Sequence, residues 1–216
     1  LKIKGRVVIT GIGKSAIIAQ KIVATFNSTG TPALYMHAAD AIHGDLGMIQ
    51  QDDLVICISK SGNSPEIKAL APLITKNNTI LIGMVGNLDS YLAYNSTYIL
   101  DTTVDAEACP HNLAPTTSTT AQMAMGDALA VALIKCRDFK SDDFAKYHPG
   151  GALGKKLYLT LGEMAQANAR PSVSENASLS ECILAMTKGR LGAVLVTKDS
   201  ALVGIITDGD LRRMLA

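Results

Sequence analysis

Short apolar runs alternate with helical patterns over the first two-thirds of the chain. The runs are rich in Ile, Val and Leu and show little polar alternation, which is typical of parallel strands covered on both faces. Five segments fit this description: RVVIT at 6–10, ALYM at 33–36, DLVICI at 53–58, TILIGMV at 79–85 and TYIL at 97–100. Their alternation with helices predicts an α/β fold with a doubly wound, parallel five-stranded sheet.

Helical patterns occupy the intervening segments. The shorter ones are Ser15–Ser28, Pro65–Lys76 and a segment near Ser90. A longer, Ala- and Met-rich pattern covers Thr119–Arg137, and Ser118 or Thr119 is its expected N-cap. Because this helix is apolar nearly all round, we expect core burial to cover part of it and a subunit interface to cover the rest.

The pattern changes near Leu157. Residues 178–216 predict a helix, a strand, a turn at KDSA, a second strand and a final helix capped by Thr207 or Asp208. The segment ANARPS at 167–172 has the composition of a linker. We therefore expect one domain over residues 1–157 and a small α+β domain over residues 158–216.

Composition excludes some partners. The net charge is +1, and no basic run interleaved with aromatic residues is present, which argues against nucleic acid or an anionic membrane as a partner.

The four cysteines are Cys57, Cys109, Cys136 and Cys182. They form no CxxC pair, so we expect reduced thiols in a cytoplasmic protein. No signal peptide or long apolar span is visible. The first residue is not Met, so we expect the chain to begin inside a longer protein.

Ligands of doubly wound sheets bind outside the carboxyl ends of the strands, where helix N-termini attract anions. One candidate loop there is TGIGKSA at 10–16. Gly11, Gly13 and Ala16 match the dinucleotide fingerprint G-x-G-x-x-G/A, but no acid ends the second predicted strand. A Walker A loop would need glycine at Val8. The loop is equally well explained as a tight turn, and it places the cation of Lys14 at the mouth of the sheet.

Two further loops are rich in side-chain hydrogen-bond donors. One contains Ser59, Ser61, Asn63 and Ser64, and the other contains five consecutive hydroxyl residues at 116–120. Ordinary helix capping needs one such residue at each start. Two rich loops favour a phosphorylated small molecule as ligand. No Walker B-like partner or clear Mg²⁺ cage appears, so we do not expect nucleotide hydrolysis.

Several motifs carry a family resemblance. SKSGNSPE, TTSTT and the strand alternation resemble a sugar isomerase (SIS) domain. GIGKS, FNSTGTPALYMHAADAIHGDLGMI, EACPHNLAPTTSTTAQMAMGDALAVAL and HPGGALGKKL are similar to the arabinose 5-phosphate isomerase family, over residues 6 to about 157. The tail VGIITDGDLRRML resembles the first cystathionine-β-synthase (CBS) repeat of that family. Members usually carry a second repeat and a helix before the first strand, and both are missing here.

The resemblance implies an activity. The family interconverts D-ribulose 5-phosphate and D-arabinose 5-phosphate through a cis-enediolate, for synthesis of Kdo, an acidic sugar of lipopolysaccharide and some capsules. It implies a phosphorylated pentose as substrate, no required cofactor, and a homodimer or homotetramer with shared sites. The tail suggests feedback by CMP-Kdo. A sugar-phosphate sensor without catalysis is the alternative, and a dinucleotide-dependent oxidoreductase is a third reading.

The resemblance also implies site residues. Lys14, Glu66, Glu107 and His148 match catalytic positions, whereas Gly30, Thr31 and His43 match substrate contacts. The hydroxyl loops imply phosphate contacts from Ser59, Ser61, Asn63, Ser64, Thr117, Ser118, Thr119 and Thr120. His37 matches a histidine that takes inhibitory zinc in relatives. Lys60 and Asn63 depart from the family pattern, which often has Asn and Glu there.

The four catalytic candidates have open roles. Glu107 or Glu66 is the expected base, if burial raises its pKa toward the working pH. His148 could open the sugar ring or shuttle a hydroxyl proton, and it could serve a neighbouring subunit. Lys14 could stabilise the enediolate or bind phosphate. Each also has a structural explanation: a tight turn at Lys14, a helix stop at His148, a dipole-favoured acid at Glu66 and a solvated loop acid at Glu107.

Overall fold

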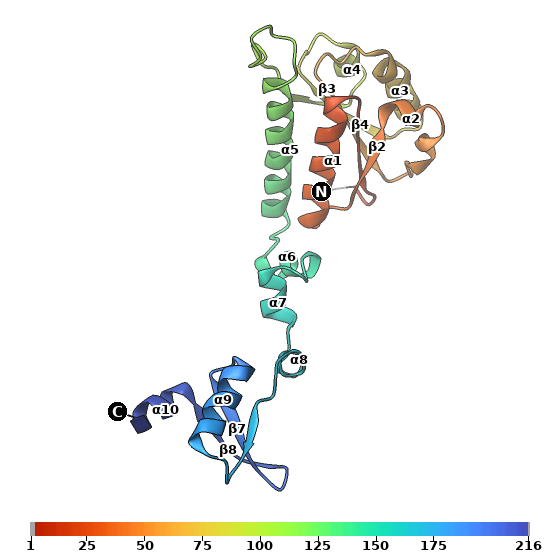
Figure 1. The fold of residues 1–216 in the computed structure, drawn as a ribbon. Coiled ribbons are helices and arrows are strands. Elements are labelled where there is room, and N and C mark those ends of the chain that lie inside the picture. Colours follow the sequence, from red (N-terminus) through yellow and green to blue (C-terminus); the bar gives the residue numbers. More distant parts are fainter. Residues whose placement is uncertain (1–2, 216) are drawn as a thin grey trace. The chain divides into compact units, whose positions relative to one another are not determined.

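The computed structural model describes residues 3–215, except for the side chains of residues 152, 153 and 215. The chain divides into two compact units, residues 1–153 and 154–216, which are described separately (Figure 1). This division lies a little before residue 157, where the pattern along the chain predicted it.

The first unit is built on a parallel sheet. Its strands are β1 Val7–Gly11, β2 Ala33–His37, β3 Leu54–Ser59, β4 Ile80–Val85 and β5 Tyr98–Asp101. Their order is β2-β1-β3-β4-β5, and each neighbouring pair is parallel. The predicted five-stranded parallel sheet is confirmed. The order reverses between β1 and β3, so the crevice outside the carboxyl ends of these two strands is where a ligand is expected.

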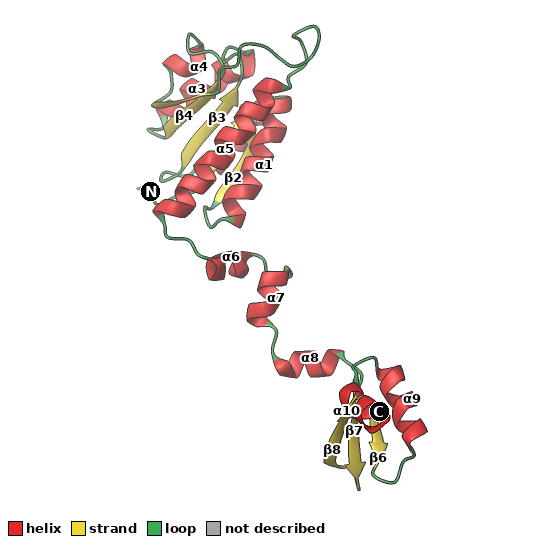
Figure 2. Ribbon diagram, turned by 90° about the vertical axis from the view of Figure 1, so that its left-hand side faces the viewer, coloured by secondary structure: helices red, strands yellow, loops and turns green. Residues whose placement is uncertain are grey.

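Helices cover both faces of this sheet. α1 Lys14–Ser28 and α5 Thr117–Cys136 lie side by side on one face (Figure 2). α2 Ala38–Ala41, α3 Pro65–Lys76 and α4 Tyr91–Tyr94 pack on the other, and the short 3-10 helix η1 Asp45–Met48 follows α2. The structure confirms the helices predicted after β1, β3 and β4. α2 and η1 were not predicted, because segments this short carry little periodic signal.

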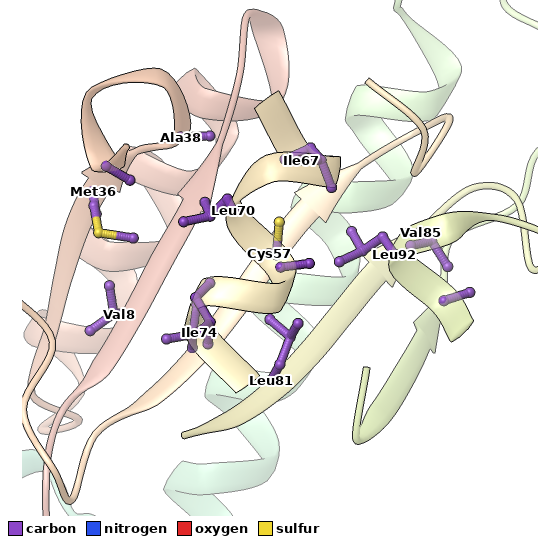
Figure 3. Packing of buried hydrophobic residues seen from close by; sticks show 14 residues of the cluster. Val8, Met36, Ala38, Cys57, Ile67, Leu70, Ile74, Leu81, Val85 and Leu92 are labelled. Atoms are coloured by element: carbon purple, nitrogen blue, oxygen red, sulfur yellow. The ribbon is translucent and has the colours of Figure 1, made fainter. Parts of the chain in front are cut away.

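Alternate strand residues supply the two halves of the core. On β3, Ile56 and Ile58 pack toward Ile22 and Phe26 of α1, whereas Val55 and Cys57 pack toward α3. Figure 3 shows Cys57 beside Leu70 and Ile74 of α3. Truncating one of these buried side chains to alanine costs about 2–5 kcal/mol. Burial raises the pKa of the Cys57 thiol to about 12, so this cysteine is a packing residue and not a reactive one.

Three short helices follow α5 along the chain: α6 Ser141–Tyr147, α7 Ala152–Tyr158 and α8 Leu161–Ala167. None of them was predicted. α8 begins with a capping box, in which the Thr160 hydroxyl accepts from the Glu163 amide and the Glu163 carboxylate accepts from the Thr160 amide.

The second unit contains a three-stranded sheet in the order β6-β7-β8. Its elements are β6 Ser172–Ser174, α9 Leu179–Gly189, β7 Ala193–Lys198, β8 Ala201–Thr207 and α10 Asp208–Leu215. β7 and β8 form the predicted antiparallel hairpin, and Asp199 and Ser200 turn with positive φ, as a two-residue hairpin requires. The Thr207 hydroxyl accepts from the Asp210 amide, so Thr207 is the cap. β6 was missed because it has three residues.

Candidate functional site

The loops at the carboxyl ends of β1 and β3 stand on either side of the reversal in strand order. Lys14 opens α1 directly after β1 and is exposed. Ser59 ends β3 and is buried, and the loop that follows it leads into α3. The predicted loops after β1 and β3 therefore both lie at the edge of the sheet where a ligand is expected.

Backbone and side-chain hydrogen bonds shape the loop between β3 and α3. The Ser59 hydroxyl accepts from the Gly62 amide at 3.0 Å, and the Ser61 hydroxyl accepts from the Asn63 amide at 3.3 Å. Asn63 Oδ1 accepts from the Tyr91 amide at 3.0 Å. Gly62 has φ +64°, and a Cβ there would stand 2.2 Å from Ser90 Oγ, so only glycine fits. Both serine hydroxyls keep a proton to donate to a ligand.

The start of α3 has unused hydrogen-bonding groups. Ser64 is the N-cap, but its hydroxyl caps no amide, and within residues 3–215 its buried Oγ has no partner. Glu66 follows in the first turn and is half-buried, and its carboxylate has no hydrogen bond or ion pair within that range. First-turn amides of a helix have no intrahelical partners. This helix start can therefore donate to an anion, with a free carboxylate beside it.

Glu107 lies at the start of α5, and its side chain has no exposed surface. Its Oε1 accepts from Lys60 Nζ at 2.7 Å and Ser118 Oγ at 2.5 Å. Its Oε2 accepts from the amides of Thr116 and Ser118 at 2.8 and 3.1 Å. The Lys60 contact, then the Ser118 hydroxyl and the Thr116 amide, outweigh burial and hold the pKa of Glu107 well below its usual range. The raised pKa that was the condition for Glu107 as the base is therefore not found.

The same carboxylate explains where α5 begins. Thr116 is the N-cap, and it caps no amide with its own side chain. Glu107 accepts from the amides instead, so Ser118 and Thr119 are not the cap and that prediction is wrong. The hydroxyls of Thr119 and Thr120 donate back to the Thr116 carbonyl at 2.9 and 3.0 Å. Among the residues described, only Thr117 of this hydroxyl run keeps an unbonded side chain.

Two histidines lie at the end of β2 and just beyond it. His37 ends the strand, and its Nδ1 lies 3.5 Å from Asp40 Oδ2. His43 is exposed beyond α2. No group of three or more His, Cys, Asp or Glu side chains within the described residues is arranged to hold a metal ion. Zinc binding at His37 stays a prediction, with Asp40 as the neighbouring oxygen donor.

Three expected site residues lie at the amino ends of the strands, opposite the edge of the sheet that holds Lys14 and Glu66. Gly30 and Thr31 precede β2, and Arg137 donates to the Gly30 carbonyl and to the Thr31 hydroxyl at 3.0 and 2.8 Å. His148 follows α6, which Figure 1 shows after the end of α5. The His148 ring stacks on that of Phe144, with 3.8 Å between the ring centroids. The 20 residues of α5 span about 30 Å between the two edges. Within one chain, these residues do not meet Lys14 or Glu66.

Two residues of the site, Lys60 and Gln122, were not predicted from the sequence. Lys60 appeared only as a departure from a pattern, although a lysine inside a hydroxyl-rich loop is itself a signal. Gln122 of α5 is buried and its Oε1 accepts from Ser15 Oγ at 3.2 Å, which ties α5 to α1 beside Lys14. A glutamine within a largely apolar helix could have indicated this buried hydrogen bond.

A cavity of about 340 Å³ lies in the second unit. Its lining is mostly apolar and includes Met164, Pro171, Leu195 and Ile205. Asn168 and Arg170 are the polar side chains of this lining, and none of the site residues described above belongs to it.

Comparison with known proteins identifies the fold family. The SIS domain model matches residues 1–132, which is more than half of the chain, and the CBS domain model matches residues 167–216. The chain belongs to the SIS domain family. The resemblance to a SIS domain followed by a CBS repeat is thereby confirmed.

Similar proteins carry related names. A Haemophilus influenzae protein named "Probable arabinose 5-phosphate isomerase" is 46% identical over the whole chain and 64% of its own length. Arabinose 5-phosphate isomerase KdsD of Escherichia coli K12 is 48% identical over 98% of the chain and 65% of its own length. The chain thus spans just under two-thirds of the length of these relatives. An Escherichia coli CFT073 protein solved in complex with arabinose 5-phosphate is 44% identical, with a TM-score of 0.66 over 68% of this chain and 78% of that one.

No helix among residues 3–215 is both long and apolar enough to cross a membrane.

Proposed function

We propose that the chain is the isomerase part of an arabinose 5-phosphate isomerase, which interconverts D-arabinose 5-phosphate and D-ribulose 5-phosphate. The observation that carries the proposal is the free, half-buried carboxylate of Glu66 at a helix start whose loop offers unused donors. The names of the relatives, and a relative in complex with arabinose 5-phosphate, support this choice of substrate.

The phosphate of the sugar binds at the start of α3. Ser59, Ser61 and Ser64 donate their hydroxyl protons, and the first-turn amides add backbone donors with the positive end of the helix dipole. The start of α5 contributes less, because Glu107 already occupies its amides and the Ser118 hydroxyl. Thr117 is the residue there that is free to add a contact.

Glu66 is the base in this proposal. It takes the proton from C2 of the aldose, and the electron pair forms the C1–C2 double bond of the cis-enediolate. As the ketone forms, the C2 hydroxyl gives up its proton, a proton is taken up by the C1 oxygen, which becomes the C1 hydroxyl, and the proton held by Glu66 returns to C1. Such acid–base catalysis contributes about 10²–10⁴-fold. Lys14, exposed at the start of α1, stabilises the developing oxyanion. The reaction needs no cofactor, because the sugar is neither oxidised nor reduced overall.

The site is shared between subunits of a homodimer or homotetramer. Gly30, Thr31 and His148 serve a neighbouring subunit, a reading supported by their position at the far end of α5, a helix about 30 Å long whose start lies at the site. The exposed side chains of Ile17 and Val131, on α1 and α5, are 65% and 60% accessible and suit a subunit contact. Mixing inactive His148→Ala and Glu66→Gln subunits tests this arrangement: recovered activity supports it, and a mixture that stays inactive after subunit exchange contradicts it.

The second unit regulates the first in this proposal, by binding CMP-Kdo, the end product of Kdo synthesis, in the cytoplasm. Support comes from the match of residues 167–216 to a CBS domain and from the relatives' names. If saturating CMP-Kdo neither bound nor slowed the full-length protein, this part of the proposal would be abandoned.

Deuterium exchange tests the activity itself. The full-length protein is incubated with arabinose 5-phosphate in D₂O, and NMR follows the C2 proton and the ribulose 5-phosphate formed. We expect exchange at C2 together with ketose. Tight binding with neither exchange nor ketose would instead favour the sugar-phosphate sensor.

A further inference from the structure

Lys60 joins two loops that are far apart in the sequence. It stands between Ser59 and Ser61, and its Nζ lies 2.7 Å from Oε1 of Glu107, 47 residues along the chain. The lysine side chain is 46% exposed, whereas the Glu107 side chain has no exposed surface. Through this ion pair, a lysine at the surface holds the buried carboxylate of Glu107. The pair joins the loop before α3 to the loop before α5.

The end of β4 holds the Lys60 side chain in this direction. The Gly86 amide donates to the Lys60 carbonyl at 3.1 Å. A Cβ at position 86 would stand 3.0 Å from that carbonyl oxygen and 3.2 Å from Lys60 Cγ. The absence of a side chain at Gly86 leaves room for the aliphatic part of the Lys60 side chain. The backbone after β4 therefore helps to set the direction in which Lys60 points.

The other contacts of the Glu107 carboxylate come from Thr116 and Ser118, at the start of α5. Among the residues described, Lys60 is the only partner of the Glu107 carboxylate that lies outside this segment. Glu107 thus connects the α5 start to the phosphate loop through Lys60. Without the ammonium group, nothing in this network would tie the two loops together.

We propose that Lys60 is a positioning residue for the isomerisation: by pairing with Glu107 it holds the loop before α5 against the loop before α3, and so fixes the geometry around Glu66. This inference rests on the proposed function and deepens it. Lys60 does not contact the reacting atoms. Its effect passes through Glu107, and a small displacement of groups around a reacting centre can cost about 10²-fold in rate.

Three variants of the full-length protein separate the pairing from general effects of charge. Lys60→Met keeps the stem and removes the ammonium group, and Lys60→Arg keeps a cation. Lys68→Met is the matched control, because Lys68 is an exposed lysine on α3 with no ion pair in the described part of the chain. We expect kcat to fall about 10–100-fold in Lys60→Met with KM nearly unchanged, and both other variants to stay within about 3-fold of the unmodified protein.

The pH profile adds a readout that a purely structural role would not change. Without Lys60, Glu107 becomes protonated at a higher pH than in the unmodified protein, so the loss in Lys60→Met should deepen as the pH falls toward the ordinary carboxyl pKa of 4.5. A lysine that instead bound the phosphate directly would raise KM and leave this profile unchanged, which would overturn the proposal. Full kcat in Lys60→Met would overturn it as well.

A measurement without turnover separates this proposal from the proposed function. The carboxyl carbon of Glu107 is followed by ¹³C NMR between about pH 3 and 7, and Glu107→Gln assigns its signal. We expect the signal to titrate at a higher pH in Lys60→Met than in the unmodified protein, and identical titrations would contradict the pairing. If the unmodified protein forms no ketose, the proposed function fails, while the titration still decides whether Lys60 holds Glu107.

Discussion

Two helix starts at the same edge of the sheet are built in opposite ways. At α3, the Ser64 hydroxyl has no partner within residues 3–215, and Glu66 has a free carboxylate. At α5, Glu107 already accepts from the amides of Thr116 and Ser118 and from the Ser118 hydroxyl. Both segments are rich in Ser and Thr. The difference teaches that hydroxyl content alone does not make an anion site, because donors that are already bonded cannot serve a ligand.

The largest expected effect comes from the free acid at α3. Glu66→Gln should lower kcat by about 10³-fold, because it removes the base that moves the proton between C2 and C1. The melting temperature should change little, since the Glu66 carboxylate has no bonded partner in the described range and its interaction with the dipole of α3 contributes at most about 1 kcal/mol. Steady-state kinetics and a thermal melt check both statements. A variant that keeps a tenth or more of the original kcat would show that another group is the base.

A smaller effect is expected from the unused hydroxyl at α3. Ser64→Ala should raise KM for arabinose 5-phosphate about 10-fold, since a hydrogen bond to a charged group contributes about 1.5–3 kcal/mol. Initial rates over a range of substrate concentrations measure the change. An unchanged KM would mean that the phosphate does not reach this hydroxyl.

Stability should depend on pH through the bonded acid at α5. The folded structure lowers the pKa of Glu107 from its ordinary value of 4.5, chiefly through Lys60. A lowered pKa gives stability that is fully present above the ordinary pKa and is lost as the pH falls below it. Glu107→Gln should therefore melt several degrees below the unmodified protein at pH 7, and the gap should narrow below about pH 4. A gap that stays constant with pH would contradict this account.

The smallest effect should come from a bonded hydroxyl at α5. Thr120 donates to the Thr116 carbonyl at 3.0 Å, so it has no proton left for a phosphate. Thr120→Val should change KM by less than about 2-fold, because the shape is kept and no ligand contact is lost. This variant is the matched control for Ser64→Ala. A KM increase as large as that of Ser64→Ala would remove the distinction between the two helix starts.

The sequence predicted the fold well, because the central strands of the sheet are buried on both faces. Segments such as 53–58 and 79–85 carry continuous apolar runs with Ile, Val and Leu, and both are strands of the sheet. Their order explains why the loops after β1 and β3 meet at one edge. The predicted hairpin of the second unit followed from a short polar turn between two apolar runs.

The failed predictions concern contacts between distant segments. Glu107 is ion-paired with Lys60, 47 residues away, and no local pattern reveals such a partner. The α5 cap was wrong for the same reason, since Glu107 accepts from the amides that a local hydroxyl would otherwise serve. The position of Thr31 was available from the sequence: it directly precedes a strand, which places it at the amino edge of the sheet, away from Lys14.

The contrast between the two helix starts can be measured directly by titrating ¹⁵N-labelled protein with arabinose 5-phosphate and following the backbone amides. We expect large, saturating shifts at the amides of Ser64 and Glu66, and small ones at the amides of Thr116 and Ser118, which stay bonded to Glu107. Large shifts at Thr116 and Ser118 with little change at Ser64 and Glu66 would contradict the contrast, because the phosphate would then have displaced Glu107 from the start of α5.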